Sequence, residues 1–137
     1  MKNQIDYQTI EFKSAFDIEL DSITIPLPIN SILKGVNVRK NTQLASFAET
    51  HAVQVMVELI QVDGNSNIRL RHQLMRGIIY ASEDGSDNIV YEKTLNGIYD
   101  IPIQKEGIAL KVTVYNAINS SSTIQINYMV KNLEGGI

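Results

Sequence analysis

Hydrophobic and polar side chains alternate with a period of two along most of this chain. In residues 53–62, Val53, Val55 and Val57 fall on one side and Glu58 falls on the other. A strand with this pattern has one face on a hydrophobic core and one on water or a partner. The same alternation recurs at 68–74, 108–115 and 124–130.

Residues typical of turns separate these runs. They predict a hairpin at 63–67, whose Asp-Gly pair supplies a positive φ, a second Asp-Gly turn at 83–88, a sharp reversal at Asn96-Gly97 and a third hairpin closed by 119–122. The expected strands are 8–14, 17–25, 32–38, 53–62, 68–74, 89–95, 98–103, 108–115 and 124–130.

About nine strands at such short spacing predict an all-β fold, an antiparallel β-sandwich of the jelly-roll type. The length of 137 residues fits one domain, 1–137, that buries a single core. Segment 41–52 leaves two alternatives open. Leu44, Phe47 and Ala48 share a helical face that Asn41 or Thr42 could cap, and a long loop across the end of the sandwich fits equally well.

Two prolines interrupt the alternation at positions 26 and 28. Because proline has no N–H to donate, we expect Pro26 and Pro28 at a strand end or on a sheet edge. The chain should then turn at Asn30-Ser31, as a rigid corner between the two sheets. Gly35, inside the returning strand, indicates a bulge or a close backbone approach.

Composition excludes several classes of function. The net charge of −3 and the pI near 5.3 offer no basic surface for nucleic acid. The absence of cysteine excludes disulfides and thiolate metal sites. The N-terminal residues lack a signal-peptide pattern and no apolar run is long enough to cross a membrane, so we expect synthesis in the cytoplasm without a signal peptide.

The candidate catalytic and metal-binding residues are few. His51 is expected in a loop, and His72 shares the inward face of Ile68, Leu70 and Leu74, so the two do not predict a catalytic or metal site. The acidic turns 63–65 and 83–88 contain oxygen ligands for calcium, but they lack an EF-hand ladder and suit hairpin turns. We therefore assign no catalytic, cofactor-binding or metal-binding residue and expect no enzyme activity.

Surface binding is the remaining possibility. Arg69, Arg71, Arg76 and Lys111 could form a small basic patch, although outward charges also protect sheets from edge pairing. Sugar binding usually uses an aromatic platform; tryptophan is absent, and of the six tyrosines only Tyr115 clearly faces outward. Hydrophobic residues at expected outward positions predict a protein interface; these are Met56, Ile60, Met75 and Met129.

Two segments carry a family resemblance. Residues 23–45 (ITIPLPINSILKGVNVRKNTQLA) resemble small jelly-roll structural proteins of tailed bacteriophages, in which a strand ending in IPLPANA-like residues precedes an I-x-G-V-x-V strand. Residues 110–130 (LKVTVYNAINSSSTIQINYMV) are similar to the last two strands of such domains. The resemblance implies a virion component, either a head decoration (auxiliary capsid) protein or a tail or fibre accessory domain.

Two functional hypotheses follow. The first is a structural protein of a virion that assembles with copies of itself and with a capsid or tail protein, without nucleic acid, membrane or cofactor. The second is a carbohydrate-binding β-sandwich with a tyrosine-lined groove, acidic loop ligands and calcium. The absence of tryptophan and of a secretion signal favours the first.

Overall fold

The structure is a computed structural model that describes residues 4–13, 18–41, 50–83, 89–117 and 123–133. All nine expected strands are present. They are β1 (Gln4–Lys13), β2 (Ile18–Pro26), β3 (Ser31–Asn41), β4 (Thr50–Val62), β5 (Ile68–Glu83), β6 (Ile89–Lys93), β7 (Leu95–Ile103), β8 (Ile108–Ala117) and β9 (Thr123–Asn132).

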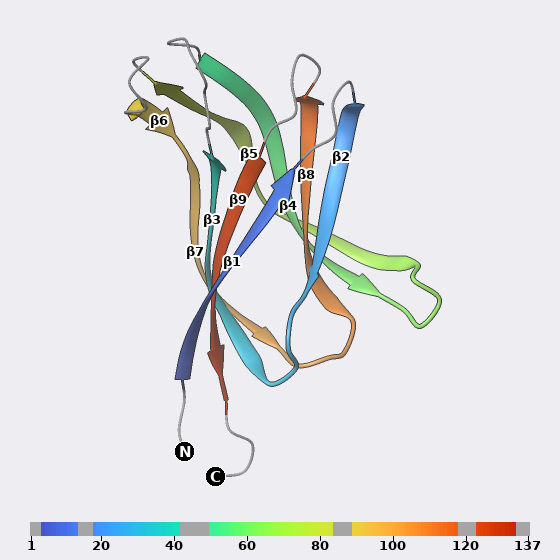
Figure 1. Cartoon of the computed structure of the whole chain (residues 1–137). Helices are drawn as coiled ribbons and strands as arrows, with labels where there is room; N and C mark the ends of the chain where they lie inside the picture. Colours follow the sequence, from blue (N-terminus) through green and yellow to red (C-terminus); the bar gives the residue numbers. More distant parts are fainter. Residues whose placement is uncertain (1–3, 14–17, 42–49, 84–88, 118–122, 134–137) are drawn as a thin grey trace.

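The strands form two antiparallel sheets that pack face to face (Figure 1). One sheet has the order β1-β9-β3-β7, and the other has the order β2-β8-β4-β5-β6. The chain alternates between the sheets from β1 to β4 and again from β7 to β9. This exchange between two four-stranded sheets is the jelly-roll arrangement, with β6 added beyond β5. The predicted all-β, jelly-roll sandwich is confirmed.

The last two strands do not form the hairpin that the sequence predicted. β8 pairs with β2 and β4, whereas β9 pairs with β1 and β3 in the opposite sheet. The connection through 119–122 therefore crosses between sheets. Its own residues, like the turn at 84–88 and the alternatives at 42–49, lie outside the described part of the chain.

The core fills the space between the two sheets. Its fully buried side chains come from the inward positions of β3, β4, β5, β7, β8 and β9. The largest are Leu33, Val38, Val55, Val57, Ile79, Ile103, Leu110, Val112, Val114, Ile124 and Ile126.

The two prolines form the predicted corner between sheets. Pro26 ends the edge strand β2, and the N–H of Leu27 still donates to Ile108 O at 2.9 Å. Asn30 then adopts φ 62°, and the Ser31 hydroxyl donates to Pro28 O at 2.6 Å as the chain enters β3 in the other sheet. The predicted corner and turn are confirmed.

The predicted bulge at Gly35 is also present. The register of β3 shifts between Leu33 and Gly35 against both of its neighbours, β7 and β9. The predicted reversal at Asn96-Gly97 is wrong, because both residues lie inside β7, opposite Asn37 and Val36. An Asn-Gly pair favours a tight turn only where the tertiary structure does not hold the chain extended.

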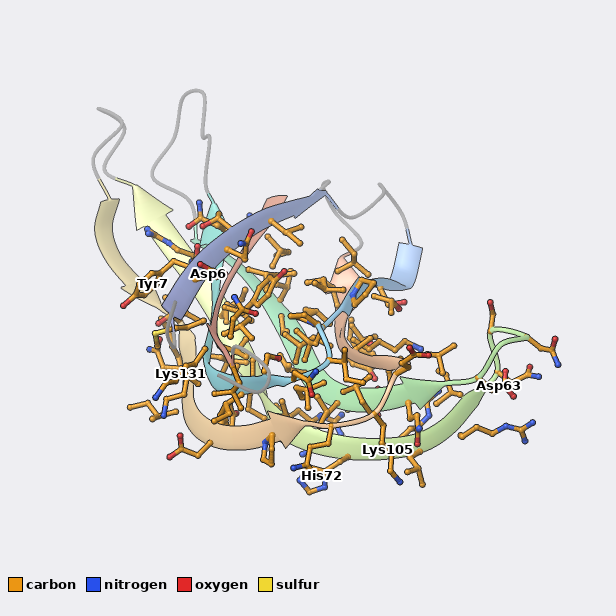
Figure 2. All side chains as sticks on the ribbon, turned by 90° about the horizontal axis from the view of Figure 1, so that it is seen from below. Asp6, Tyr7, Asp63, His72, Lys105 and Lys131 are labelled. Carbon is orange, nitrogen blue, oxygen red and sulfur yellow. The ribbon has the colours of Figure 1, made fainter. Side chains whose placement is uncertain are left out.

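The β4–β5 hairpin projects away from the sandwich (Figures 1 and 2). Leu70 and His72 pair with Gln61 and Leu59, yet both side chains are exposed, because the other sheet does not extend beneath the hairpin. The predicted inward burial of Leu70 and His72 is therefore wrong.

A bulge in β5 changes the predicted outward hydrophobic set. Val57 pairs with Met75 and Glu58 with Gln73, so Leu74 is the extra residue, and both Leu74 and Met75 pack against the core. Ile60 is buried as well, between the neighbouring strands β5 and β8. Of the predicted interface residues, Met56 and Met129 remain, and both are half-buried.

Candidate functional site

The two histidines are not brought together by the fold. His51 lies in β4, opposite Ala81, and not in the loop that the sequence predicted. His72 is exposed on the projecting hairpin (Figure 2). Within the described ranges, no group of three or more histidine, aspartate or glutamate side chains could hold a metal ion.

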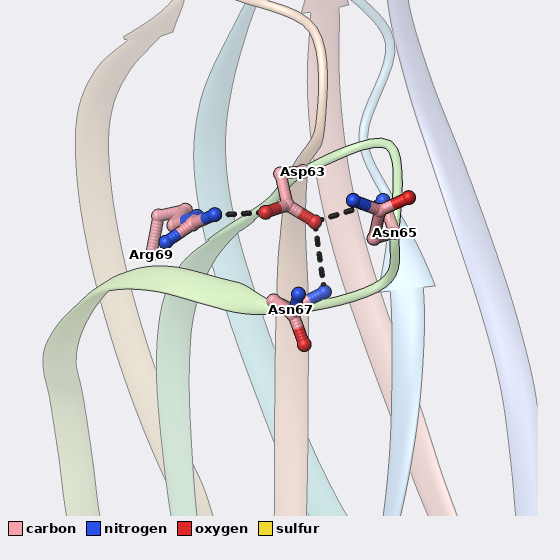
Figure 3. Close-up of polar contacts among 4 residues, drawn as sticks. All are labelled: Asp63, Asn65, Asn67 and Arg69. Atoms are coloured by element: carbon pink, nitrogen blue, oxygen red, sulfur yellow. Dashed lines mark hydrogen bonds and ion pairs between the residues drawn. The ribbon is translucent and has the colours of Figure 1, made fainter.

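The Asp63 turn is closed by its own carboxylate (Figure 3). Asp63 Oδ1 accepts from the N–H groups of Asn65 at 2.9 Å and Asn67 at 3.0 Å, and Oδ2 accepts from Arg69 Nε at 2.7 Å. The hydrogen bonds from the backbone of Asn67 and then Asn65 lower the pKa of Asp63. The positive φ of this turn falls on Ser66, at 64°, and not on Gly64. The carboxylate thus has a structural role in the turn.

The basic residues form contacts within the hairpin and sheet, not an open basic patch. Arg69 pairs with Asp63, and Arg71 Nη1 lies 3.0 Å from Glu58 Oε1. The guanidinium of Arg76 lies 5.8 Å from the centre of the Tyr115 ring, at a distance suited to a cation–π contact. A site for an acidic ligand is therefore not favoured there.

A groove of about 540 Å³ lies on the outer face of the β1-β9-β3-β7 sheet. It crosses all four strands, and two rows of outward side chains form it. A volume of this size is in the range of small-ligand pockets in proteins. We define the groove by the lining residues Tyr7, Thr9, Gly35, Asn37, Asn96, Ile98, Asn127 and Met129.

The first row is polar and continuous across the sheet. Thr9, Asn127, Asn37 and Asn96 are direct neighbours in the strand register. The Thr9 hydroxyl donates to Asn127 Oδ1 at 2.8 Å, and Asn127 Nδ2 donates to Asn37 Oδ1 at 3.0 Å. Asn37 Nδ2 then donates to Asn96 Oδ1, and Asn96 Nδ2 to the Thr94 hydroxyl at 3.0 Å. Each amide is held by its neighbours in one orientation.

The second row is apolar and runs parallel to the first. Tyr7 pairs with Met129, Met129 with Gly35, and Gly35 with Ile98. The side chains at the two ends are open to solvent, since Tyr7 is 77% and Ile98 93% exposed. A Cβ at Gly35 would lie 3.3 Å from Met129 Cε, so glycine leaves room for Met129 over β3. Tyr7 points to the outside of the sandwich (Figure 2).

The lining offers binding groups but few groups for acid–base chemistry. Thr9 and the three asparagines are uncharged donors and acceptors, and the second row supplies an aromatic ring and two aliphatic side chains. Tyr128 borders the groove, but its ring packs against the core, and burial raises the pKa of its hydroxyl. The groove therefore fits binding and gives no support to catalysis.

Sequence reasoning missed this groove for two reasons. The residue types of Asn96-Gly97 predict a turn, and the expected first strand starts at residue 8, after Tyr7. Alternation therefore leaves Tyr115 as the tyrosine that is predicted to face outward. Tyr115 is half-buried beside Arg76, whereas Tyr7 is exposed. The available signal was weak: polar asparagines at outward positions of three separate strands.

Comparisons with known proteins show the fold. No protein-family model matches the chain, and no curated protein matches its sequence. A chain in the structure of infectious bursal disease virus, Gx strain, is similar over 99% of this chain, with a TM-score of 0.50 and 11% sequence identity. A chain in the structure of the Gt strain is similar over 98%, with a TM-score of 0.47 and 9% identity. This chain spans only 35% and 33% of those chains.

At this identity, the likeness to the Gx-strain structure shows a shared jelly-roll fold and nothing finer. The described part of the chain contains no helix that is long and apolar enough to cross a membrane.

Proposed function

We propose that this protein is a non-enzymatic structural component of a virus particle and acts as a single domain through protein–protein contacts. The observation that carries the proposal is the likeness of almost the whole chain, in its jelly-roll arrangement, to a chain in a virus structure. Jelly rolls are frequent in viral shells, although one fold can serve many functions.

The finer proposal is a head decoration protein or a tail or fibre accessory protein of a tailed bacteriophage. It rests on the resemblance of residues 23–45 and 110–130 to such proteins. The first segment includes the proline corner between β2 and β3, and the second includes β8 and β9. The resemblance therefore involves strands of both sheets and the connection between them.

The projecting β4–β5 hairpin is the surface that we propose for contact with a neighbouring subunit. Leu70, near its end, is 63% exposed. Its neighbours Arg69 and Arg71 form ion pairs with Asp63 and Glu58 within the hairpin. An exposed leucine on a projecting element is well placed to insert into a partner.

Light scattering coupled to size-exclusion chromatography tests the proposal. We expect the wild-type mass to rise above that of the monomer with concentration, and Leu70→Ser to shift the distribution back towards monomer. Ile78→Ser is the matched control, because Ile78 is also exposed on β5 but pairs with Gln54 of β4, away from the projecting end of the hairpin. A wild-type protein that stays monomeric, and that fails to bind shell or tail proteins encoded beside it, would contradict the proposal.

A further inference from the structure

We propose that the groove on the outer face of the β1-β9-β3-β7 sheet binds an uncharged saccharide. In this arrangement a saccharide of at least two units lies across the strands: one ring packs on Tyr7 at the β1 edge, and the hydroxyls of the following unit contact the amides of Asn37 on β3 and Asn96 on β7. The inference goes beyond the assembly role and does not depend on it. It rests on the spare hydrogen-bonding capacity of the polar row, on the open aromatic ring beside it and on the absence of charge in the lining.

The polar row has donors and acceptors left over. An asparagine amide carries two N–H donors and an oxygen with two lone pairs. Among the contacts of the described residues, Asn37 and Asn96 each donate one hydrogen bond and each accept one. One donor and one acceptor therefore remain on each amide. Neighbouring hydroxyls of a sugar, each both donor and acceptor, match such a pair.

The row is also ordered before any ligand arrives. Asn127 donates to both Asn37 and Gln125 and accepts from Thr9, so both of its N–H donors are engaged within the sheet. It fixes the orientation of Asn37, which in turn fixes that of Asn96. Binding to preorganised groups avoids the entropic cost of ordering side chains.

Tyr7 supplies the apolar platform. Tyr7 and Thr9 are two residues apart on β1, so their side chains lie on the same face of the sheet. The ring of Tyr7 therefore stands beside the β1 end of the amide row. An exposed tyrosine has a flat apolar face and a polar hydroxyl at its edge. The C–H groups on one face of a sugar ring pack on such a surface, while the hydroxyls point to the polar row.

The charge of the lining selects among ligands. The side chains that define the groove carry no formal charge at neutral pH. Lys34, next to Gly35 in the chain, is ion-paired with Asp100 on β7. Nucleic acids and acidic sugars would find no compensating cation in the lining, so an uncharged saccharide is favoured.

A protein partner fits this groove less well. An apolar protein surface placed over the row would remove water from the spare donors and acceptors of Asn37 and Asn96 without replacing it. A ligand rich in hydroxyls satisfies them. The groove lining includes no acidic side chain, so the binding should not need the calcium that the sequence hypothesis invoked.

The test begins with an array of uncharged glycans probed with the full chain. Saturation-transfer NMR follows with disaccharides of glucose, galactose, mannose and N-acetylglucosamine, which are long enough to reach from β1 to β3 and β7. We expect signal for at least one of them, unchanged by a calcium chelator. Tyr7→Ala should weaken affinity about tenfold through loss of the aromatic contact, whereas Tyr7→Phe should retain it. Asn96→Ala should also weaken binding, whereas Gln73→Ala, an exposed amide on the other sheet, should not.

Three results would overturn the inference: no binding of any of these sugars by the folded wild-type protein, binding that Tyr7→Ala and Asn96→Ala leave unchanged, or loss of self-association in Tyr7→Ala. The last result would show that a second copy of the chain occupies the groove. Mass measurements of the same samples separate this inference from the assembly proposal, since a monomer that binds sugar fails only the latter.

Discussion

Replacing Gly107 with alanine should destabilise the fold, and more so than the same replacement at Gly64, the other turn glycine among the described residues. Gly107 has φ 83°, and its carbonyl accepts a hydrogen bond from Val62 N at 2.8 Å. A Cβ there would lie 2.3 Å from Val62 O, a backbone atom at the end of β4 that cannot rotate away.

The magnitude follows from two costs. A left-handed conformation costs a residue with a side chain about 1–2 kcal/mol. Moving the backbone to relieve the clash loses the Val62–Gly107 hydrogen bond, which contributes about 1 kcal/mol. Together these lower the free energy of unfolding by about 2–3 kcal/mol, which corresponds to a fall in Tm of roughly 10 °C for a chain of this size.

Gly64→Ala is the matched control in the Asp63 turn. No atom lies within 4 Å of a Cβ at Gly64, and its φ is outside the left-handed region. We expect a change within about 0.5–1 kcal/mol, in the stabilising direction if any. Urea unfolding followed by circular dichroism, with equal m-values, measures both variants. Equal losses in the two variants, or a Gly107→Ala midpoint equal to that of the wild type, would refute the reasoning.

Three further changes test other parts of the structure. Arg71→Met removes the cation beside the Glu58 carboxylate, whose side chain is only 8% exposed, and should lower the free energy of unfolding in urea by about 1–2 kcal/mol. The double variant Arg71→Met with Glu58→Gln should recover part of that loss, because no buried charge is then left without a partner. Lys40 is 4% exposed and burial lowers its pKa, so its positive charge opposes folding below the folded-state pKa. Lys40→Met should therefore raise Tm at pH 7, and this gain should disappear above about pH 10.4, where the lysine is neutral in the unfolded chain as well. Because the pKa of Asp63 is lowered, its contribution to stability is present above about pH 3.9 and is lost as the pH falls through the folded-state pKa; the Tm advantage of the wild type over Asp63→Asn should therefore shrink in acid, and an advantage independent of pH would contradict the role of the carboxylate.

The strands and the proline corner could be predicted from sequence because their causes are local. Alternation with a period of two reports which side chains share a face, whatever the partner strand is. Proline lacks an N–H in every context, so Pro26 and Pro28 had to leave the ladder. The hairpin at 63–67 was predicted for the same reason, from residues that close a turn on their own.

The predictions of side-chain environment failed where a neighbouring strand or sheet decides it. Leu70 and His72 lie on the expected face, but the hairpin extends past the opposite sheet and leaves them exposed. The bulge at Leu74 turns the side chain of Met75 towards the core, and no residue type in 68–74 predicts a bulge. The Asn96-Gly97 pair is held straight by its ladder with β3.

The sequence by itself therefore determined nine strands, an all-β fold and a corner between two sheets. Only the tertiary structure decided which sheet β8 and β9 join, and only it assembled the groove. Thr9 and Asn127 are 118 residues apart, and Asn37 and Asn127 are 90 apart. Their meeting depends on the register of three strands from distant parts of the chain. Such a register is set by how the whole core packs, because a slip of one residue would turn every side chain of a strand to its other face.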